Sequence, residues 1–150
     1  MNDDIQPQPS TRPDVPASED EEVIALANSM LDAARRGDGD GLLPLIDRGA
    51  PANLRDASGN SALMLAAYHG HAELVRELAA RGADVDLLND RRQSPLAGAA
   101  FKGYTDVAVA LLEAGADPGL GSPDALETAR FFERGEMITL IEEHAARRED

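Results

Sequence analysis

Apolar residues along this chain recur at spacings of three and four, and short polar stretches separate the runs. Leu74, Val75 and Leu78 form one such run. A longer run nearer the start of the chain has five members at the same spacing: Ile24, Ala27, Met30, Leu31 and Ala34. This spacing places side chains on one face of an α-helix. The pattern therefore predicts short amphipathic helices that each bury one face against a neighbour.

Two sets of glycines divide the chain into units of 33 residues. One set is Gly37, Gly70 and Gly103, and the other is Gly49, Gly82 and Gly115. A fixed period of this length is typical of repeat architectures. Each unit is expected to contain two helices that are joined at the first glycine. The second glycine should follow the second helix, where a left-handed C-cap favours a residue without a Cβ atom.

Several residues predict where the helices begin. Ser61 and Ser94 suit the N-caps of the first helix in two units, and Pro95 suits the first helical position. Ser18 and Glu21 suggest a capping box for the first helix of the chain, and Ser122-Pro123 is expected to open a helix near the end. A turn is expected at Asn89-Asp90, within an extended segment.

Residues 56–71 read DASGNSALMLAAYHGH and resemble the ankyrin signature D-x-x-G-x-T-P-L-H-x-A-A-x-x-G-H. The sequences QSPL at residues 93–96 and EAGAD at residues 113–117 resemble the same repeat. The resemblance covers about residues 20–147. It implies an all-α fold, an ankyrin-repeat solenoid of four stacked helix-turn-helix repeats with short β-hairpin-like loops.

Four departures from the family pattern affect this interpretation, and one is a link from the third repeat to the fourth that is about three residues short. Met64 and Ala97 stand where the signature has His, so the hydrogen bond from that His to the cap hydroxyl is absent. Arg92 stands where the repeat has its turn glycine, and a non-glycine residue there must strain or change the turn. Pro44 falls inside an expected helix, which should therefore start late or kink.

The domain organisation follows from these registers. Residues 18–147 form the expected ankyrin repeat domain, with a cap at 18–55, repeats at 56–88 and 89–118, and a cap at 119–147, whose last helix is lined by Met137, Ile138 and Ile141. Residues 1–17 hold four of the nine prolines and few apolar residues, so they are expected to be a disordered acidic tail. Residues 148–150 form a charged C-terminal end.

The resemblance also implies a binding surface, because ankyrin proteins usually bind through the inner helices and the hairpin tips. The inner-helix positions of this chain are Arg35, Arg36, Tyr68, His69, Phe101, Lys102 and Phe131. The hairpin positions are Arg55, Ser58, Asn60, Leu88, Arg91 and Gln93.

Rings at successive inner-helix positions suggest interface hot spots, although packing at the base of the hairpins would explain them equally well. Phe132, next to Phe131, is expected to be buried by the cap. The basic residues on this face favour a partner that carries an acidic or carboxylate-bearing segment. The acidic tail is a candidate competitor for the same face.

Composition excludes several other functions. A formal net charge of -14 argues against a nucleic-acid partner and against docking on anionic lipid. There is no cysteine, hence no disulfide and no zinc site with Cys ligands. No signal peptide is evident in the first 22 residues, and no apolar run approaches the roughly 20 residues that a membrane span needs. We expect a cytoplasmic monomer.

Catalytic chemistry is not expected either. His69 and His71 lack a third ligand at a useful spacing, and the loop at residues 37–41 lacks the features of a calcium or phosphate site. No Ser-His-Asp arrangement is recognisable. The sequence predicts a non-catalytic protein–protein interaction module with no cofactor and no metal. The alternatives are a regulatory or inhibitory subunit of an enzyme and, less favoured, a small metal-dependent enzyme that uses the two histidines.

Overall fold

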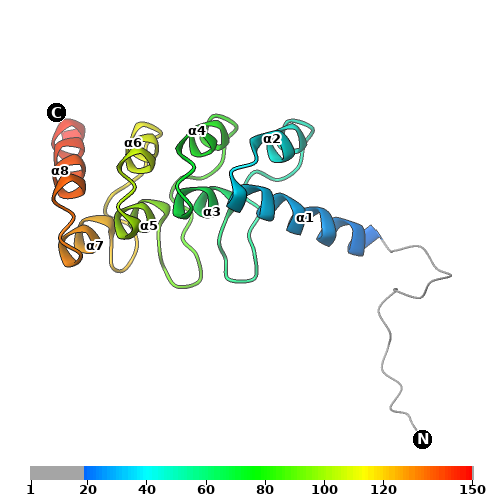
Figure 1. The fold of residues 1–150 in the computed structure, drawn as a ribbon, viewed down its shortest axis with the longest axis horizontal. Helices are drawn as coiled ribbons and strands as arrows, with labels where there is room; N and C mark the ends of the chain where they lie inside the picture. The colour runs from blue at the N-terminus through cyan, green and yellow to red at the C-terminus, as the bar shows by residue number, and fades with distance from the viewer. Residues whose placement is uncertain (1–18, 150) are drawn as a thin grey trace, which may run out of the picture.

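The computed structural model describes residues 19–149, which fold into a row of four helix pairs (Figure 1). The tail predicted for residues 1–17, and Ser18 of the predicted capping box, lie outside the described residues. The helices are α1 (Glu19–Arg36), α2 (Gly39–Asp47), α3 (Ala62–Tyr68), α4 (Ala72–Ala80), α5 (Pro95–Lys102), α6 (Thr105–Glu113), α7 (Ala125–Phe131) and α8 (Gly135–Glu149).

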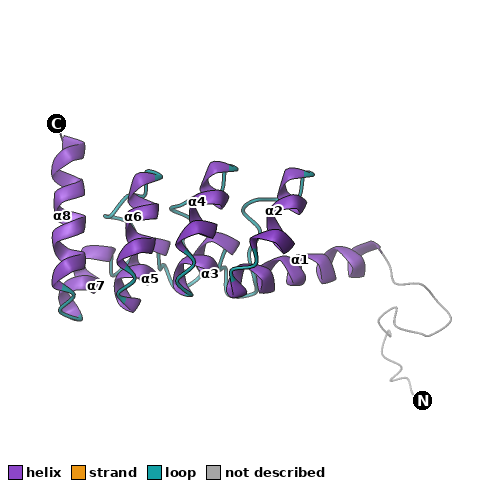
Figure 2. Cartoon of the chain, turned by 45° about the horizontal axis from the view of Figure 1, so that its top comes forward, coloured by secondary structure: helices purple, strands orange, loops and turns teal. Residues whose placement is uncertain are grey.

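These helices form two rows, an inner row of α1, α3, α5 and α7 and an outer row of α2, α4, α6 and α8 (Figures 1 and 2). Long loops leave the outer helices and return to the inner helices of the next pair. The described residues contain no sheet, and Arg55 and Ser61 form an isolated antiparallel bridge at the base of the first loop. The predicted all-α solenoid of four helix pairs is therefore confirmed.

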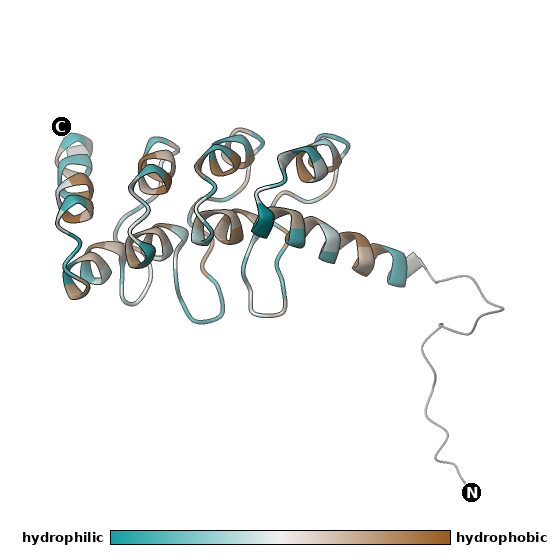
Figure 3. Cartoon of the chain, in the orientation of Figure 1, coloured by the Kyte–Doolittle hydropathy of each residue, from teal (hydrophilic) through white to brown (hydrophobic). Residues whose placement is uncertain are grey.

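Small side chains let the inner helices lie close together. Helix α3 packs between α1 and α5, and α5 packs between α3 and α7. Ala66, Ala67, Ala99 and Ala100 are all fully buried in these contacts. Larger apolar residues of the outer helices, such as Leu78, complete the core, while the loops are mainly hydrophilic (Figure 3). No single repeat could bury this surface alone, which is the physical basis of stacking in a solenoid.

Most of the predicted helix ends are confirmed. The Oγ atom of Ser61 accepts a hydrogen bond from Met64 N at 3.0 Å, and the Oγ atom of Ser94 accepts one from Ala97 N at the same distance. Gly82 has a φ of 92°, in the left-handed region that favours glycine at a C-cap. Arg92 keeps the conformation of the missing turn glycine, with a φ of 62°.

The start of α7 differs from the prediction. Ser122-Pro123 does not open the helix, because Asp124 is the N-cap and α7 begins at Ala125. The Asp124 carboxylate accepts a hydrogen bond from Glu127 N at 2.8 Å, and the Glu127 carboxylate accepts one from Asp124 N at 2.9 Å. This reciprocal capping box satisfies two backbone donors, which the Ser122 start could not do.

The late start predicted for α2 is also wrong. The helix contains Pro44 but begins at Gly39, 33 residues before α4 begins at Ala72. Asp38 fixes the start, because its side chain accepts a hydrogen bond from Gly41 N at 3.0 Å.

Helix α1 extends beyond the stack at its N-terminal end (Figure 1). It has 18 residues, whereas α3 has 7, so no inner helix of the described residues covers its first half. Met30 and Leu31 are buried as predicted, but Ile24 is 60% exposed although its spacing assigned it to the same inner face. The helical period was correct, and among residues 19–149 no inner helix lies beside the start of α1 to cover Ile24.

Candidate functional site

Four exposed aromatic side chains follow one another along the inner row of helices. They are Tyr68 on α3, Phe101 on α5, Phe131 at the end of α7, and Phe132 directly after it. The Tyr68 and Phe101 rings are stacked with centroids 6.3 Å apart, and Phe132 meets Phe101 edge-on at 5.0 Å. Phe131 meets Phe132 edge-on at 4.9 Å. We call this set the aromatic ladder.

The aromatic ladder is not buried by the last repeat. Phe131 is 79% exposed, and Phe132, which was expected to be buried, is 42% exposed. The physical reason is that α7 is the last inner helix of the described residues, so no further helix covers the ring. Phe132 rests on Phe101 instead. Large apolar side chains with this much exposure, gathered on one face, are typical of interaction surfaces.

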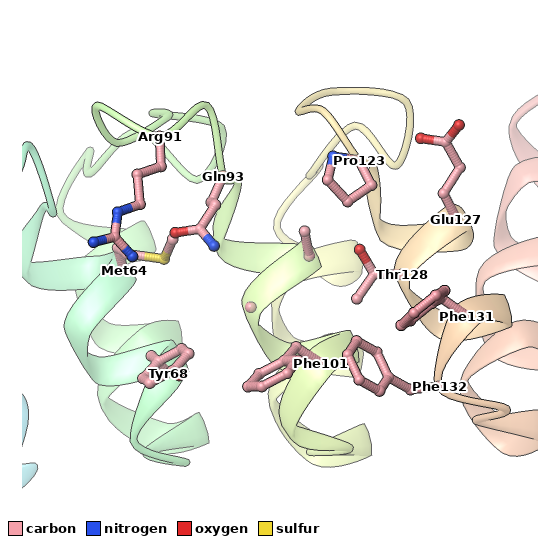
Figure 4. A pocket seen from close by; sticks show the side chains of 12 residues that line it. Met64, Tyr68, Arg91, Gln93, Phe101, Pro123, Glu127, Thr128, Phe131 and Phe132 are labelled. Atoms are coloured by element: carbon pink, nitrogen blue, oxygen red, sulfur yellow. The ribbon is translucent and has the colours of Figure 1, made fainter.

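A groove of about 570 Å³, the aromatic groove, runs along the ladder between the inner helices and the loops (Figure 4). It takes residues from α3, α5, α7 and two loops. Its lining residues are Met64, Tyr68, Arg91, Gln93, Ala97, Gly98, Phe101, Pro123, Glu127, Thr128, Phe131 and Phe132. The floor is mostly apolar, whereas Arg91 and Glu127 place opposite charges at its edges (Figure 4).

A smaller groove of about 270 Å³, the hairpin groove, continues from the aromatic groove along the loops. Met64, Tyr68, Arg91 and Gln93 line both grooves. The remaining residues of the hairpin groove are Ser58, Asn60, Leu65 and Asn89. The two grooves therefore form one continuous surface from the first long loop to α7.

Comparison with known proteins identifies the architecture. A family model described as ankyrin repeats in three copies matches residues 30–121, which is more than half of the chain. The chain belongs to the ankyrin repeat family. An ankyrin repeat protein of Pseudomonas aeruginosa is 43% identical over 63 residues, which amount to 42% of this chain and 34% of that relative. The chain thus matches about a third of the length of this relative.

Ankyrin repeats are generally protein–protein interaction modules and are generally not catalytic. The family match ends at residue 121, before α7, and the structure adds a fourth helix pair after it. That fourth pair contributes Phe131 and Phe132 to the aromatic groove. Half of the aromatic ladder therefore comes from residues that lie beyond the family match.

Hydrogen bonds within the ankyrin loops hold the groove edge in place. Asn89 Oδ1 accepts from Arg91 N at 2.9 Å and from Gln93 N at 3.0 Å. Asn89 Nδ2 donates to Asn60 Oδ1 of the preceding loop at 2.9 Å. Successive loops are therefore joined to each other, and the edge that carries Arg91 is organised before any ligand binds.

Asp56 organises the preceding loop in a similar way. Its Oδ1 atom accepts from Ser58 N and from Asn60 N, each at 2.9 Å. Burial raises the pKa of the Asp56 carboxyl, but the hydrogen bonds from Asn60 and Ser58 and the nearby Arg35 charge outweigh burial and lower the pKa below its usual value of 3.8. The carboxylate is therefore ionised at neutral pH.

Most of the basic residues predicted to line the site are engaged in structural contacts. Arg35 pairs with Asp32 at 2.5 Å and with Asp56 at 3.2 Å. Lys102 Nζ lies 4.8 Å from the centroid of the Tyr68 ring. Arg36 lies 3.7 Å from the Asp38 carboxylate. Arg91 alone of the predicted basic residues lines the grooves, and it belongs to none of the ion pairs found among residues 19–149.

The structure thus divides the predicted site residues into two groups. Those that line the two grooves are Ser58, Asn60, Tyr68, Arg91, Gln93, Phe101 and Phe131. Those that line neither groove are Arg35, Arg36, Arg55, His69, Leu88 and Lys102. Partial burial, together with electrostatic repulsion from His71, Lys102 and Arg35, lowers the pKa of the His69 imidazole below its usual value of 6.5.

The groove residues that sequence reasoning missed are Met64, Leu65, Asn89, Ala97, Gly98, Pro123, Glu127, Thr128 and Phe132. Met64 replaces the family His, and this departure could have indicated an apolar floor. Phe132 is the residue that the sequence predicts to be buried by the cap, but it is exposed. Pro123, Glu127 and Thr128 belong to the last repeat, where the 33-residue register is lost. The resemblance placed Phe131 in that repeat, but it placed none of these three residues.

The described part of the chain shows no arrangement that would support a metal site or a membrane span. No group of three or more His, Cys, Asp or Glu side chains within residues 19–149 is arranged to hold a metal ion. His71 contacts a backbone carbonyl rather than a second imidazole. None of the described helices combines the length and the apolar character required to cross a bilayer.

Proposed function

We propose that this protein binds a segment of one partner protein in the aromatic groove and the adjoining hairpin groove, without catalysing a reaction. The observation that carries the proposal is the aromatic ladder, above all Phe131, which is 79% exposed. Aromatic rings supply large contact area at a low cost in side-chain entropy and are enriched among interface hot spots. The loops that frame the ladder are already held by hydrogen bonds, which lowers the cost of binding.

The lining of the groove indicates the chemistry of the bound segment. An apolar anchor would fill the space beside Phe101 and Phe131, where Ala97 and Gly98 leave room. A carboxylate would pair with Arg91, because the guanidinium offers a fork of donors and has no ion pair among the described residues. The expected partner therefore presents an apolar segment with an acidic residue beside it.

The proposal includes a cytoplasmic setting for this interaction. The partner can be an enzyme that this chain regulates or inhibits, as one of the alternatives from the sequence suggests. Where the retained partner proves to be an enzyme, its activity with and without this protein tests that alternative directly.

Affinity measurements on matched variants test the site. The partner is first retained from a lysate of the source organism, and its dissociation constant is then measured for each variant. Phe131→Ala and Arg91→Ala should each raise the dissociation constant at least about tenfold. Val23→Ala is the control, because Val23 is 64% exposed and belongs to the first turns of α1, the end of the helix that extends beyond the stack. A partner that binds both groove variants as tightly as the wild type would overturn the proposal.

A further inference from the structure

The chain itself contains a segment whose chemistry suits the aromatic groove. Residues 6–16 read QPQPSTRPDVP, with prolines at positions 7, 9, 13 and 16 and no glycine. Proline-rich sequences favour the extended polyproline II conformation before they bind, so they lose little entropy on docking. Aromatic-lined grooves are a recurrent receptor for such segments. The aromatic groove, with rings from Tyr68 to Phe132, has this lining.

The charges of the segment and of the groove are complementary. Arg12 and Asp14 flank Pro13 in the sequence. The groove carries Arg91 on the loop side and Glu127 on α7 (Figure 4). One oxygen of the Glu127 carboxylate accepts the capping hydrogen bond from Asp124 N, which leaves the other oxygen for a ligand. Two opposite pairs, Asp14 with Arg91 and Arg12 with Glu127, would fix the position of the segment.

The geometry of α1 prevents the segment at residues 12–16 from reaching the groove of its own chain. Three Cα–Cα steps separate Pro16 from Glu19, and they span at most about 11 Å. Helix α1 has 18 residues, a length of about 27 Å, and its first residue is the end that extends out of the stack (Figure 1). The groove lies on α3, α5 and α7, beyond the other end of α1. A second molecule must therefore supply residues 12–16 to the groove.

We propose that the aromatic groove of one molecule binds residues 12–16 of a second copy of this chain. This inference rests on the proposed function, because the same groove would serve both ligands and the segment would compete with the partner. Each molecule gives a segment and accepts one through a different surface. Such a heterologous contact produces head-to-tail chains or rings rather than a closed twofold dimer. At high protein concentration the self-association keeps the groove occupied, and on dilution the second molecule dissociates and leaves the groove free.

Complementary variants of the full-length chain provide the decisive test. Pro13→Ala/Pro16→Ala alters the segment and keeps the groove, whereas Phe131→Ala alters the groove and keeps the segment. Sedimentation equilibrium should show that the wild type self-associates with rising concentration and that each variant alone does so at least about tenfold more weakly. An equimolar mixture of the two variants should form a one-to-one dimer and nothing larger. Circular dichroism and thermal melting confirm that each variant is folded.

A charge exchange tests the orientation of the segment. Arg91→Asp should weaken self-association, and Asp14→Arg introduced into the other molecule of a mixture should restore it, because the ion pair is then re-formed with its signs reversed. A labelled synthetic peptide of residues 6–17 should bind the full-length chain and be displaced by unlabelled peptide. Val23→Ala should leave all of these measurements unchanged.

Several results would overturn the inference. A wild-type chain that stays monomeric at millimolar concentration and does not bind the peptide excludes it. Self-association that persists in Phe131→Ala, or that is lost in Val23→Ala, places the contact on another surface. Failure of the inference is distinguishable from failure of the proposed function, because the partner experiment compares binding of a different protein to the same groove variants. Loss of the partner in Phe131→Ala without any self-association would retain the function and exclude this inference.

Discussion

His71, the residue before α4, donates a hydrogen bond from Nε2 to the backbone carbonyl oxygen of Arg35, 2.9 Å away in the preceding repeat. Arg35 lies in the last turn of α1, where carbonyl groups have no partner within the helix. The contact recurs two repeats later, where Arg134 donates to the carbonyl oxygen of Phe101 at 2.8 Å. At these two positions the residue before an outer helix thus closes the inner helix of the preceding repeat and joins two repeats.

Gly37 is the residue that leaves room for His71, and we predict that Gly37→Ala is strongly destabilising. The φ of Gly37 is 74°, and a Cβ atom there would lie 2.5 Å from Nδ1 of the His71 ring. The variant must therefore carry the cost of the left-handed backbone and also displace the ring from Arg35. We expect the free energy of unfolding to fall by about 2–3 kcal/mol, measured by urea denaturation.

Gly82→Ala is the matched control for this prediction. The φ of Gly82 is 92°, and an added Cβ atom there would meet no other atom within 4 Å. This variant should lose only the backbone contribution, about 1 kcal/mol. Equal losses at the two positions would show that the His71 contact adds nothing to the cost.

Arg92→Gly should stabilise the protein. Arg92 has a φ of 62° in the turn where the preceding repeat has Gly59, whose φ is 80°. A side chain in the left-handed region costs about 1 kcal/mol, and glycine removes this cost at the price of a more flexible unfolded chain. We expect a net gain of about 0.5 kcal/mol in the free energy of unfolding. Arg91→Gly, where φ is not positive, should instead lose stability, and a gain of equal size there would contradict the explanation.

The period of the sequence predicted the stack because each repeat carries its own caps and glycines. Ser61 and Ser94 could be assigned as caps from local sequence alone, since the bond runs to a backbone donor three residues later. Ile24 shows where this reasoning stops. Its place on the helical face was predictable, but its exposure depends on whether a helix from another repeat lies beside it, and none within residues 19–149 does. A local sequence pattern carries no information about such a neighbour.

The candidate site was predictable only where the repeats are regular. Tyr68 and Phe101 stand 33 residues apart, so their alignment on one face followed from the period. Phe132 could not be placed, because Glu133 stands where the other repeats have the glycine that joins their two helices. Glu133 keeps the left-handed backbone, with a φ of 55°, but without the glycine the register of the last repeat cannot be recognised in the sequence. The engagement of Arg35 by Asp56 was equally hidden, since the two residues lie 21 positions apart in different repeats.

Asp56 should make the stability of the protein depend on pH in the acidic range. Its pKa is lowered in the folded state, so the carboxylate contributes stability above its usual pKa of 3.8, and this contribution is lost as the pH falls through the folded-state value. Asp56→Asn keeps one acceptor but loses the charge. At pH 7 the variant should be less stable by about 1 kcal/mol, and the difference should shrink below pH 4.

Urea denaturation of the wild type and Asp56→Asn at pH 7, 5 and 3 measures this difference. The gap should be the same at pH 7 and pH 5 and clearly smaller at pH 3. A gap that stays constant down to pH 3 would mean that the charge of Asp56 contributes nothing and that the loop is held by the neutral hydrogen bonds alone.

The aromatic ladder should separate into a ring that packs and a ring that is free to bind. Phe101 contacts Tyr68 on one side and Phe132 on the other, and it is 39% exposed. Phe131 contacts only Phe132 within the ladder and is twice as exposed, at 79%. Aromatic pairs contribute about 0.5–1.5 kcal/mol each. Phe101→Ala should therefore cost about 1–2 kcal/mol of stability, whereas Phe131→Ala should cost less than about 0.5 kcal/mol.

A double-mutant cycle on Phe101 and Phe132 isolates the packing energy within the ladder. Their coupling in urea denaturation should be about 0.5–1.5 kcal/mol, because their edge-on contact at 5.0 Å is direct. Phe131 and Tyr68, which share no contact, should show coupling below about 0.5 kcal/mol.

A loss of stability in Phe131→Ala as large as that in Phe101→Ala would mean that both rings stabilise the fold. Loss of a partner in Phe131→Ala could then no longer be assigned to a direct contact, since unfolding would explain it.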